Sequence, residues 1–166
     1  MRCGPASCAS VLLSEGWQSD PWALTLQLDA QCDPTKDGTT SQDLLTLMDG
    51  YGFPGGLWSS WDDLDDLMRN GLGVLLLCDN RHLVPRPYPA GAAWEAMHWV
   101  RIVATSVPDG MAYVYDPLTY LYQPDGSAYQ GPTVATLESL KRAGDVTGYP
   151  EYGVAFVSPS GRDLNK

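Results

Sequence analysis

The first half of the chain has apolar residues at intervals of three and four, the period of a helix that buries one face. Leu44, Leu47 and Met48 show this period, and the polar run from Thr40 to Asp43 before them is a helix-capping signal. Comparable runs begin at Cys3, at the Asp20-Pro21 pair and at Ser60. The pattern therefore predicts four helices, over residues 3–15, 20–30, 40–50 and 60–70, and a turn over 52–56.

The second half of the chain has shorter apolar runs, typical of strands. Residues 72–78 form a continuous run that suits a buried strand. Two further runs, 97–106 and 111–116, are separated by Val-Pro-Asp-Gly, which predicts a hairpin-like turn. We also expect a short strand over 119–123, an amphipathic helix over 134–143, a last strand over 152–158, and loops over 81–93 and 124–132.

Helices followed by strands predict an α+β fold, in which N-terminal helices pack on a C-terminal antiparallel β-sheet. The length of 166 residues suits one domain with a sizeable core. We expect this domain to cover residues 1–158 and residues 159–166 to form a polar C-terminal tail.

The net charge of the chain limits the kinds of partner that we expect. The chain has 10 basic and 20 acidic side chains and a net charge of −10, with no basic stripe, so we expect no nucleic-acid partner. No apolar run approaches the ~20 residues of a membrane span, and no signal peptide opens the sequence, so we expect no membrane partner. The cellular location stays open, and association with a virus particle or release from the cell fits this sequence.

Four cysteines are too few and too irregularly spaced for a disulfide scaffold. The paired spacings of a zinc site are absent, and we expect no metal and no cofactor. Cys8, Cys32 and Cys78 are interpreted as small, buried or half-buried thiols. His82, in a proline-rich segment, is expected at the surface.

Cys3 differs from the other cysteines because it stands at the start of a predicted helix. Backbone N–H groups and the helix dipole at that position stabilise a thiolate. His98 begins an apolar strand and Asp116 ends the next, and cysteine, histidine and acid are the parts of a cysteine acyl-transfer site. Plainer interpretations are a packed thiol, a core histidine and a turn-opening Asp116-Pro117 pair.

Four segments together resemble a known family. They are the helix-opening Cys-Gly-Pro-Ala at Cys3, the Gly-Val-Leu-Leu-Leu run, His-Trp-Val-Arg-Ile-Val-Ala at His98 and Val-Tyr-Asp-Pro around Asp116. In order and separation they are similar to the papain-like bacteriocin-processing peptidases, which remove double-glycine leaders, and to their stand-alone relatives. The resemblance covers nearly the whole chain and implies a papain-like fold. It also implies that Cys3 is the nucleophile, His98 the general base and acid, and Asp116 the residue that orients the imidazole.

The chain departs from this family at one position. The family has a glutamine upstream of the nucleophile as a side-chain donor to the oxyanion, and here only Met1 and Arg2 precede Cys3. Loss of such a donor costs roughly a hundredfold or more in rate. Three explanations are open: the sequence is a piece of a longer product, a neighbouring subunit completes the site, or the protein is slow or inactive.

These observations favour a cysteine peptidase acting on a peptide, with a cell-wall peptide or an assembly partner as substrate and a phage tail or lysis component as the setting. Trp94 and Trp99, which flank His98, could line a substrate groove or the core. One alternative is an acyl transferase of the transglutaminase or arylamine N-acetyltransferase type. Another is an inactive papain-like interaction module.

Overall fold

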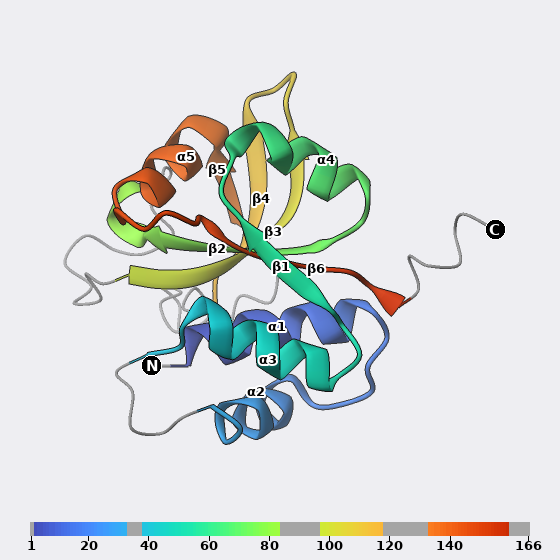
Figure 1. Ribbon diagram of the computed structural model, residues 1–166. Helices are drawn as coiled ribbons and strands as arrows, with labels where there is room; N and C mark the ends of the chain where they lie inside the picture. Colours follow the sequence, from blue (N-terminus) through green and yellow to red (C-terminus); the bar gives the residue numbers. More distant parts are fainter. Residues whose placement is uncertain (1, 33–37, 84–96, 118–132, 160–166) are drawn as a thin grey trace, which may run out of the picture.

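The computed structural model describes residues 2–32, 38–83, 97–117 and 133–159 (Figure 1). Within these ranges the helices are α1 (Cys3–Ser14), α2 (Pro21–Asp29), α3 (Ser41–Gly50), α4 (Leu64–Arg69) and α5 (Leu137–Asp145), with 3-10 turns η1 (Trp61–Asp63) and η2 (Asn80–His82). The strands are β1 (Gly55–Trp58), β2 (Gly73–Asp79), β3 (Met97–Ser106), β4 (Met111–Tyr115), β5 (Thr133–Thr136) and β6 (Gly153–Phe156).

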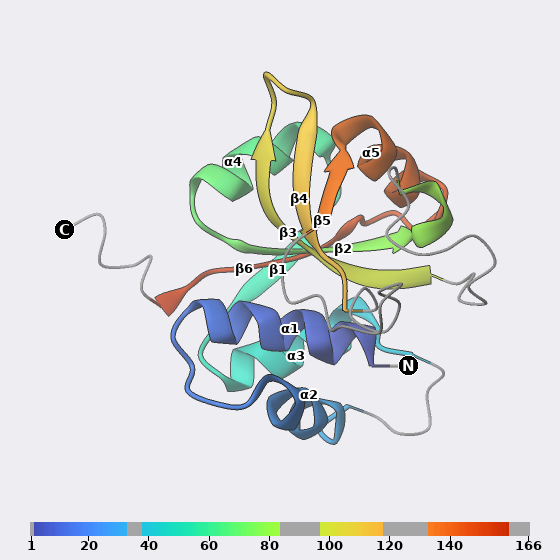
Figure 2. The ribbon, with the colours of Figure 1, turned by 180° about the vertical axis from the view of Figure 1, so that it is seen from behind.

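All six strands form one antiparallel sheet in the order β1-β6-β2-β3-β4-β5. The helices α1, α2 and α3 lie together on one side of it, and α4 and α5 lie on the other (Figure 1). Seen from behind, β3 and β4 form the predicted hairpin, which extends beyond the rest of the sheet (Figure 2). The predicted α+β class, with N-terminal helices packed on an antiparallel sheet, is confirmed.

Two apolar clusters form the core, one on each face of the sheet. Because side chains alternate along a strand, Leu75 faces the N-terminal helices while Leu76 and Cys78 face α4 and α5. By the same alternation His98, Val100 and Ile102 in β3 face the α5 side. Cys3 therefore comes from the helical layer on one side of the sheet, and His98 from the strand face on the other side.

Local chemistry explains the helix boundaries. Asp20 caps α2 through its carboxylate, which accepts from the N–H of Ala23 at 2.9 Å, and Pro21 occupies the first helical position. Thr40 and Asp43 form a reciprocal capping box at the start of α3, as the sequence predicted. These caps fix where α2 and α3 begin, and Thr39, which precedes the cap of α3, lies beside Gly4 at the start of α1.

Three sequence predictions differ from the structure. The predicted turn over 52–56 contains the start of β1, because pairing with β6 overrides the two glycines; a Cβ at Gly55 would lie 2.5 Å from the carbonyl oxygen of Ala155. The predicted helix over 134–143 begins later, since Thr133–Thr136 pairs with β4 and Thr136 then caps α5. The predicted helix over 60–70 is divided into η1 and α4.

Several other expectations lie outside the described residues. They are the short strand over 119–123, the turn-rich segment over 124–132, most of the loop over 81–93 and nearly all of the polar tail over 159–166. In the described part of the loop, residues 81–83, Arg81 and His82 belong to the 3-10 turn η2. None of the described helices has the length and hydropathy that crossing a membrane would require.

Candidate active site

Cys3 is the first residue of α1 and its side chain is buried, with 7% of its surface exposed. The N–H of Ala6 bonds the carbonyl of Arg2 at 2.9 Å, and Pro5 has no N–H. The N–H groups of Cys3 and Gly4 are therefore the two at this helix end that have no intrahelical carbonyl to bond. The Gly4 N–H is directed at the Cys3 sulfur, where it favours the thiolate.

His98 and Asp116 form the second part of the site. The Nε2 atom of His98 lies 2.7 Å from Oδ1 of Asp116, and both side chains are buried. His98 lies in β3. Asp116 directly follows β4, which ends at Tyr115 and pairs with β3. The other ring nitrogen, Nδ1, has no hydrogen-bond partner of ordinary geometry among the described residues. That nitrogen is the one left to act on the Cys3 thiol, with which the ring interacts.

The electrostatics of the pair favour charge separation. Burial by itself raises the pKa of Cys3, but the hydrogen bond and positive charge of His98, with the N–H groups of Trp99 and Gly4, lower it below the ordinary value. Burial by itself lowers the pKa of His98, but the charge and hydrogen bond of Asp116, followed by Cys3, raise it to about 9. The site therefore favours a thiolate beside an imidazolium, the form that reacts with electrophiles.

The free edge of β3 brings Cys3 to His98. In the β2–β3 ladder Leu77 lies opposite Trp99, and the N–H of Leu77 bonds the carbonyl of Tyr152 at 2.8 Å, on the other side of β2. The N–H and C=O of Trp99 therefore face away from β2. Because the β3–β4 pairing starts only at Arg101, β4 does not cover them. The first turns of α1 occupy this edge instead.

Contacts that the sequence did not predict hold this arrangement. The hydroxyl of Ser7, fully buried, donates to the carbonyl of Trp99 at 3.2 Å. The indole of Trp99 donates to the carbonyl of Thr39 at 2.8 Å. A Cβ at Gly4 would lie 2.9 Å from Cβ of Thr39, so glycine is needed where the loop meets α1. A serine four residues after the cysteine, on the same helix face, was the available sequence signal for this contact.

The structure thus brings together all three residues that the sequence selected, Cys3, His98 and Asp116. Cys8 and Cys78 are buried and Cys32 is half-buried, as interpreted from the sequence, and none of the four is in a disulfide. His82 lies in η2, with 29% of its side chain exposed. The side chain of Trp99 is in the core beside the N-terminal helices and not in a groove, and Trp94 lies outside the described residues.

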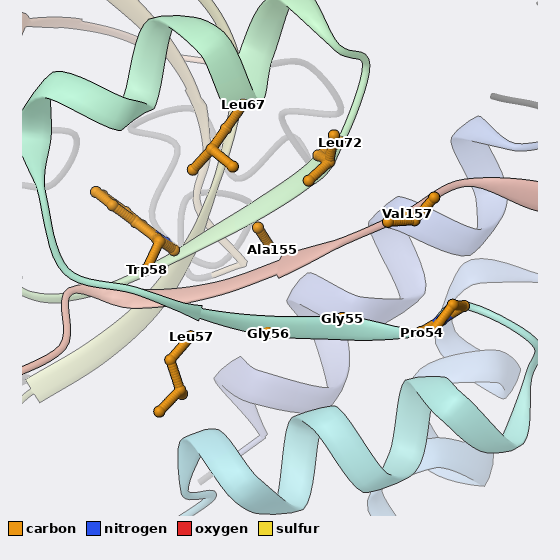
Figure 3. A pocket seen from close by; sticks show the side chains of 9 residues that line it. All are labelled: Pro54, Gly55, Gly56, Leu57, Trp58, Leu67, Leu72, Ala155 and Val157. Carbon is orange, nitrogen blue, oxygen red and sulfur yellow. The ribbon is translucent and has the colours of Figure 1, made fainter. Parts of the chain in front are cut away.

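A shallow apolar pocket lies elsewhere, between α4 and the edge formed by β1 and β6 (Figure 3). Its volume is about 300 Å³. It is lined by Pro54, Gly55, Gly56, Leu57, Trp58, Leu67, Leu72, Ala155 and Val157. No lining residue has a titratable side chain, so the pocket offers no group for acid–base or nucleophilic chemistry. No cluster of three metal-ligating side chains occurs among the residues that the structure describes.

No family model matches the chain, and no curated protein matches it in sequence. Solved structures do match its fold. The peptidase domain of Streptococcus ComA, a bi-functional ABC transporter involved in quorum sensing, superposes with a TM-score of 0.60 at 17% identity, over 94% of this chain and 89% of that domain. A double-glycine motif protease from an AMS/PCAT transporter, solved with its leader peptide, gives a TM-score of 0.51 at 18% identity, over 94% and 82%. The chain therefore has the papain-like fold of these peptidase domains.

Proposed function

We propose that this chain is a papain-like cysteine peptidase in which Cys3 attacks, His98 transfers protons and Asp116 orients the imidazole. The observation that carries the proposal is that the two ring nitrogens of His98 have different surroundings. Its Nε2 is bonded to a buried carboxylate at 2.7 Å, while Nδ1 has no hydrogen-bond partner among the described residues, and the ring interacts with the Cys3 thiol at the helix start. A cysteine and an acid on opposite nitrogens of one histidine is the arrangement that activates a nucleophile.

The chemistry follows from this arrangement. The Cys3 thiolate attacks the carbonyl carbon of a peptide bond, and the N–H of Cys3 stabilises the negative oxygen that forms. Imidazolium His98 then donates its Nδ1 proton to the leaving amine, which leaves an acyl thioester on Cys3. Water attacks the thioester as neutral His98 accepts its proton, and the carboxylic acid product and the thiolate are released.

The side-chain donor to the oxyanion is the weak part of the site. The four described glutamines bond elsewhere: Gln18 to the carbonyl of Gly16, Gln27 and Gln31 to the hydroxyl of Tyr51, and Gln42 to the hydroxyl of Thr46. The N–H of Cys3 is the donor that the described residues supply, and one missing oxyanion donor costs roughly a hundredfold or more in rate. A second donor from a neighbouring subunit or from a longer product would therefore speed hydrolysis by about that factor.

The substrate we propose is a peptide. The fold is shared with a ComA peptidase domain and with a double-glycine protease solved with a leader peptide, which favours peptide over other acyl substrates. A cell-wall peptide or a partner protein cleaved during assembly, as in a phage tail or a lysis system, is the finer form of this proposal. We place the catalytic domain at residues 1–158, with residues 159–166 as its tail.

The proposal is tested by incubating the protein with three substrates: a peptide containing a double-glycine site, a cross-linked cell-wall peptide, and the double-glycine peptide with a primary amine. Mass spectrometry should detect hydrolysis products that Cys3→Ala protein does not form. Transfer to the amine in preference to water would identify an acyl transferase. If none of the substrates is cleaved, and iodoacetamide labels all four thiols slowly and at equal rates, the protein is an inactive interaction module.

A further inference from the structure

Ser7 is buried one helical turn after the nucleophile, and its contact spans the two layers of the site. Its side chain is fully buried, and its hydroxyl donates across the layer boundary to the carbonyl of Trp99 at 3.2 Å. A serine in a helix usually bonds a carbonyl of its own helix, as Ser10 bonds Ser7 and Ser14 bonds Val11. The Ser7 hydroxyl is used differently, because it joins α1 to the free edge of β3.

The residue that Ser7 contacts is also the residue that touches the nucleophile. The N–H and C=O of Trp99 point to the same side of β3, away from β2. The carbonyl accepts the Ser7 hydroxyl, and the N–H is directed at the sulfur of Cys3. A movement of this main-chain segment would therefore change the Cys3 environment, and it would also move His98, the preceding residue.

A second contact lies one turn further along α1. The guanidinium of Arg101 donates from Nη1 to the carbonyl of Ser10 at 2.5 Å, and the Arg101 side chain is half-buried between α1 and β3. Arg101 is not among the groups that shift the pKa of Cys3. Its contact with Ser10 joins α1 to β3 at a second point.

From these contacts we propose that Ser7 is a positioning residue: its bond to the Trp99 carbonyl sets the distance between α1 and β3, and with it the placement of the Cys3 thiol against His98. Arg101 supports the same alignment from Ser10. The proposal rests on the function proposed above, in which Cys3 and His98 act together. The new element is Ser7, as the residue that keeps Cys3 and His98 close enough to act together.

Loss of the Ser7 hydroxyl leaves the Trp99 carbonyl buried without its partner, so the β3 edge should shift to find another donor. The stabilisation of the thiolate depends on the N–H of Trp99 and on His98, and both would move. At a pH below the pKa of Cys3, each unit of rise in that pKa reduces the thiolate fraction about tenfold. We expect iodoacetamide labelling of Cys3 on the acid side of its pH profile to slow by up to about tenfold in Ser7→Ala.

The experiment measures the labelling rate of each cysteine against pH by peptide mapping, in the wild type, Ser7→Ala and Ser10→Ala. Ser10→Ala is the matched control, because it removes a hydroxyl from the same helix but only a bond within that helix. The expected result is a pH profile of Cys3 displaced upward in Ser7→Ala and unchanged in Ser10→Ala. An unchanged profile in folded Ser7→Ala would overturn the positioning role.

If Ser7→Ala does not fold, Arg101→Met supplies the test, since it keeps the apolar stem and removes the contact with Ser10. It should displace the Cys3 profile in the same direction by about threefold in rate. An unchanged profile there would refute the alignment of α1 on β3. The proposed function fails in a different way: Cys3 of the wild type would label no faster than Cys32, or His98→Ala would leave its rate unchanged.

Discussion

Replacement of Asp116 by asparagine isolates the charge of that residue from its geometry. Asparagine keeps an oxygen that can accept from Nε2 of His98, so the bond now measuring 2.7 Å can persist without the negative charge. In the native site burial lowers the pKa of His98, while Asp116 is the largest of the influences that raise it to about 9. Without that charge burial should dominate, and the pKa of His98 should fall to the ordinary value of about 6.5 or lower.

The size of this change sets its chemical consequence. A fall from about 9 to about 6.5 corresponds to roughly 3 kcal/mol of lost preference for the imidazolium. The sign follows from the charges: a positive imidazolium stabilises the thiolate, so a His98 that is neutral at pH 7 leaves Cys3 closer to its ordinary pKa. The thiolate–imidazolium pair of the wild type should persist until the pH approaches 9, and in Asp116→Asn it should disappear below neutral pH.

Histidine ring NMR measures this directly, because the chain has two histidines and His98→Ala assigns the signals. The ring signals of His98 are followed from acidic pH to beyond the pKa of about 9, in the wild type and in Asp116→Asn. A His98 pKa that stays near 9 in folded Asp116→Asn would refute the reasoning, since it would show that the carboxylate charge does not hold the proton on the ring.

Three further substitutions test how the site is built. Gly4→Ala should destabilise the fold by about 1–3 kcal/mol and slow Cys3 labelling, because its methyl group would lie 2.9 Å from Cβ of Thr39; Gly50→Ala, in open space within α3, is its control in denaturant unfolding. Trp99→Phe loses the indole donor to the Thr39 carbonyl and should cost about 1–3 kcal/mol, measured the same way. Gly153→Ala would place a methyl group 1.9 Å from a carbonyl oxygen of β2 and should destabilise by at least ~2 kcal/mol, and unchanged stability would contradict the β2–β6 register.

Much of this site could be predicted from the sequence because its chemistry is carried by residue types with few other uses. A cysteine before a helix-starting glycine and proline, and a histidine and an aspartate at the ends of adjacent apolar runs, are local signals. Their convergence required only the fold class and the antiparallel pairing of β3 and β4. The α+β arrangement was equally accessible, since the helical period dominates before residue 50 and strand-like runs dominate after 72.

The missed features depend on contacts between distant segments. Gly55 and Gly56 are turn residues by composition, and they enter β1 only because β6, a hundred residues later, pairs with them. The start of β5 has the apolar spacing of a helix, and the edge of β4 overrides it. Ser7 looks like any polar residue on a helix, and its partner becomes visible only when the free edge of β3 is located.

The most direct test of the central claim is detection of the acyl-enzyme. The protein is mixed with a peptide substrate, quenched in acid and digested, and the fragment containing Cys3 is weighed by mass spectrometry. The account predicts a thioester of the substrate acyl group on Cys3 in the wild type, reduced in Asp116→Asn and absent in His98→Ala. Peptide hydrolysis that continues in Cys3→Ala, or an acyl group found on another residue, would contradict it.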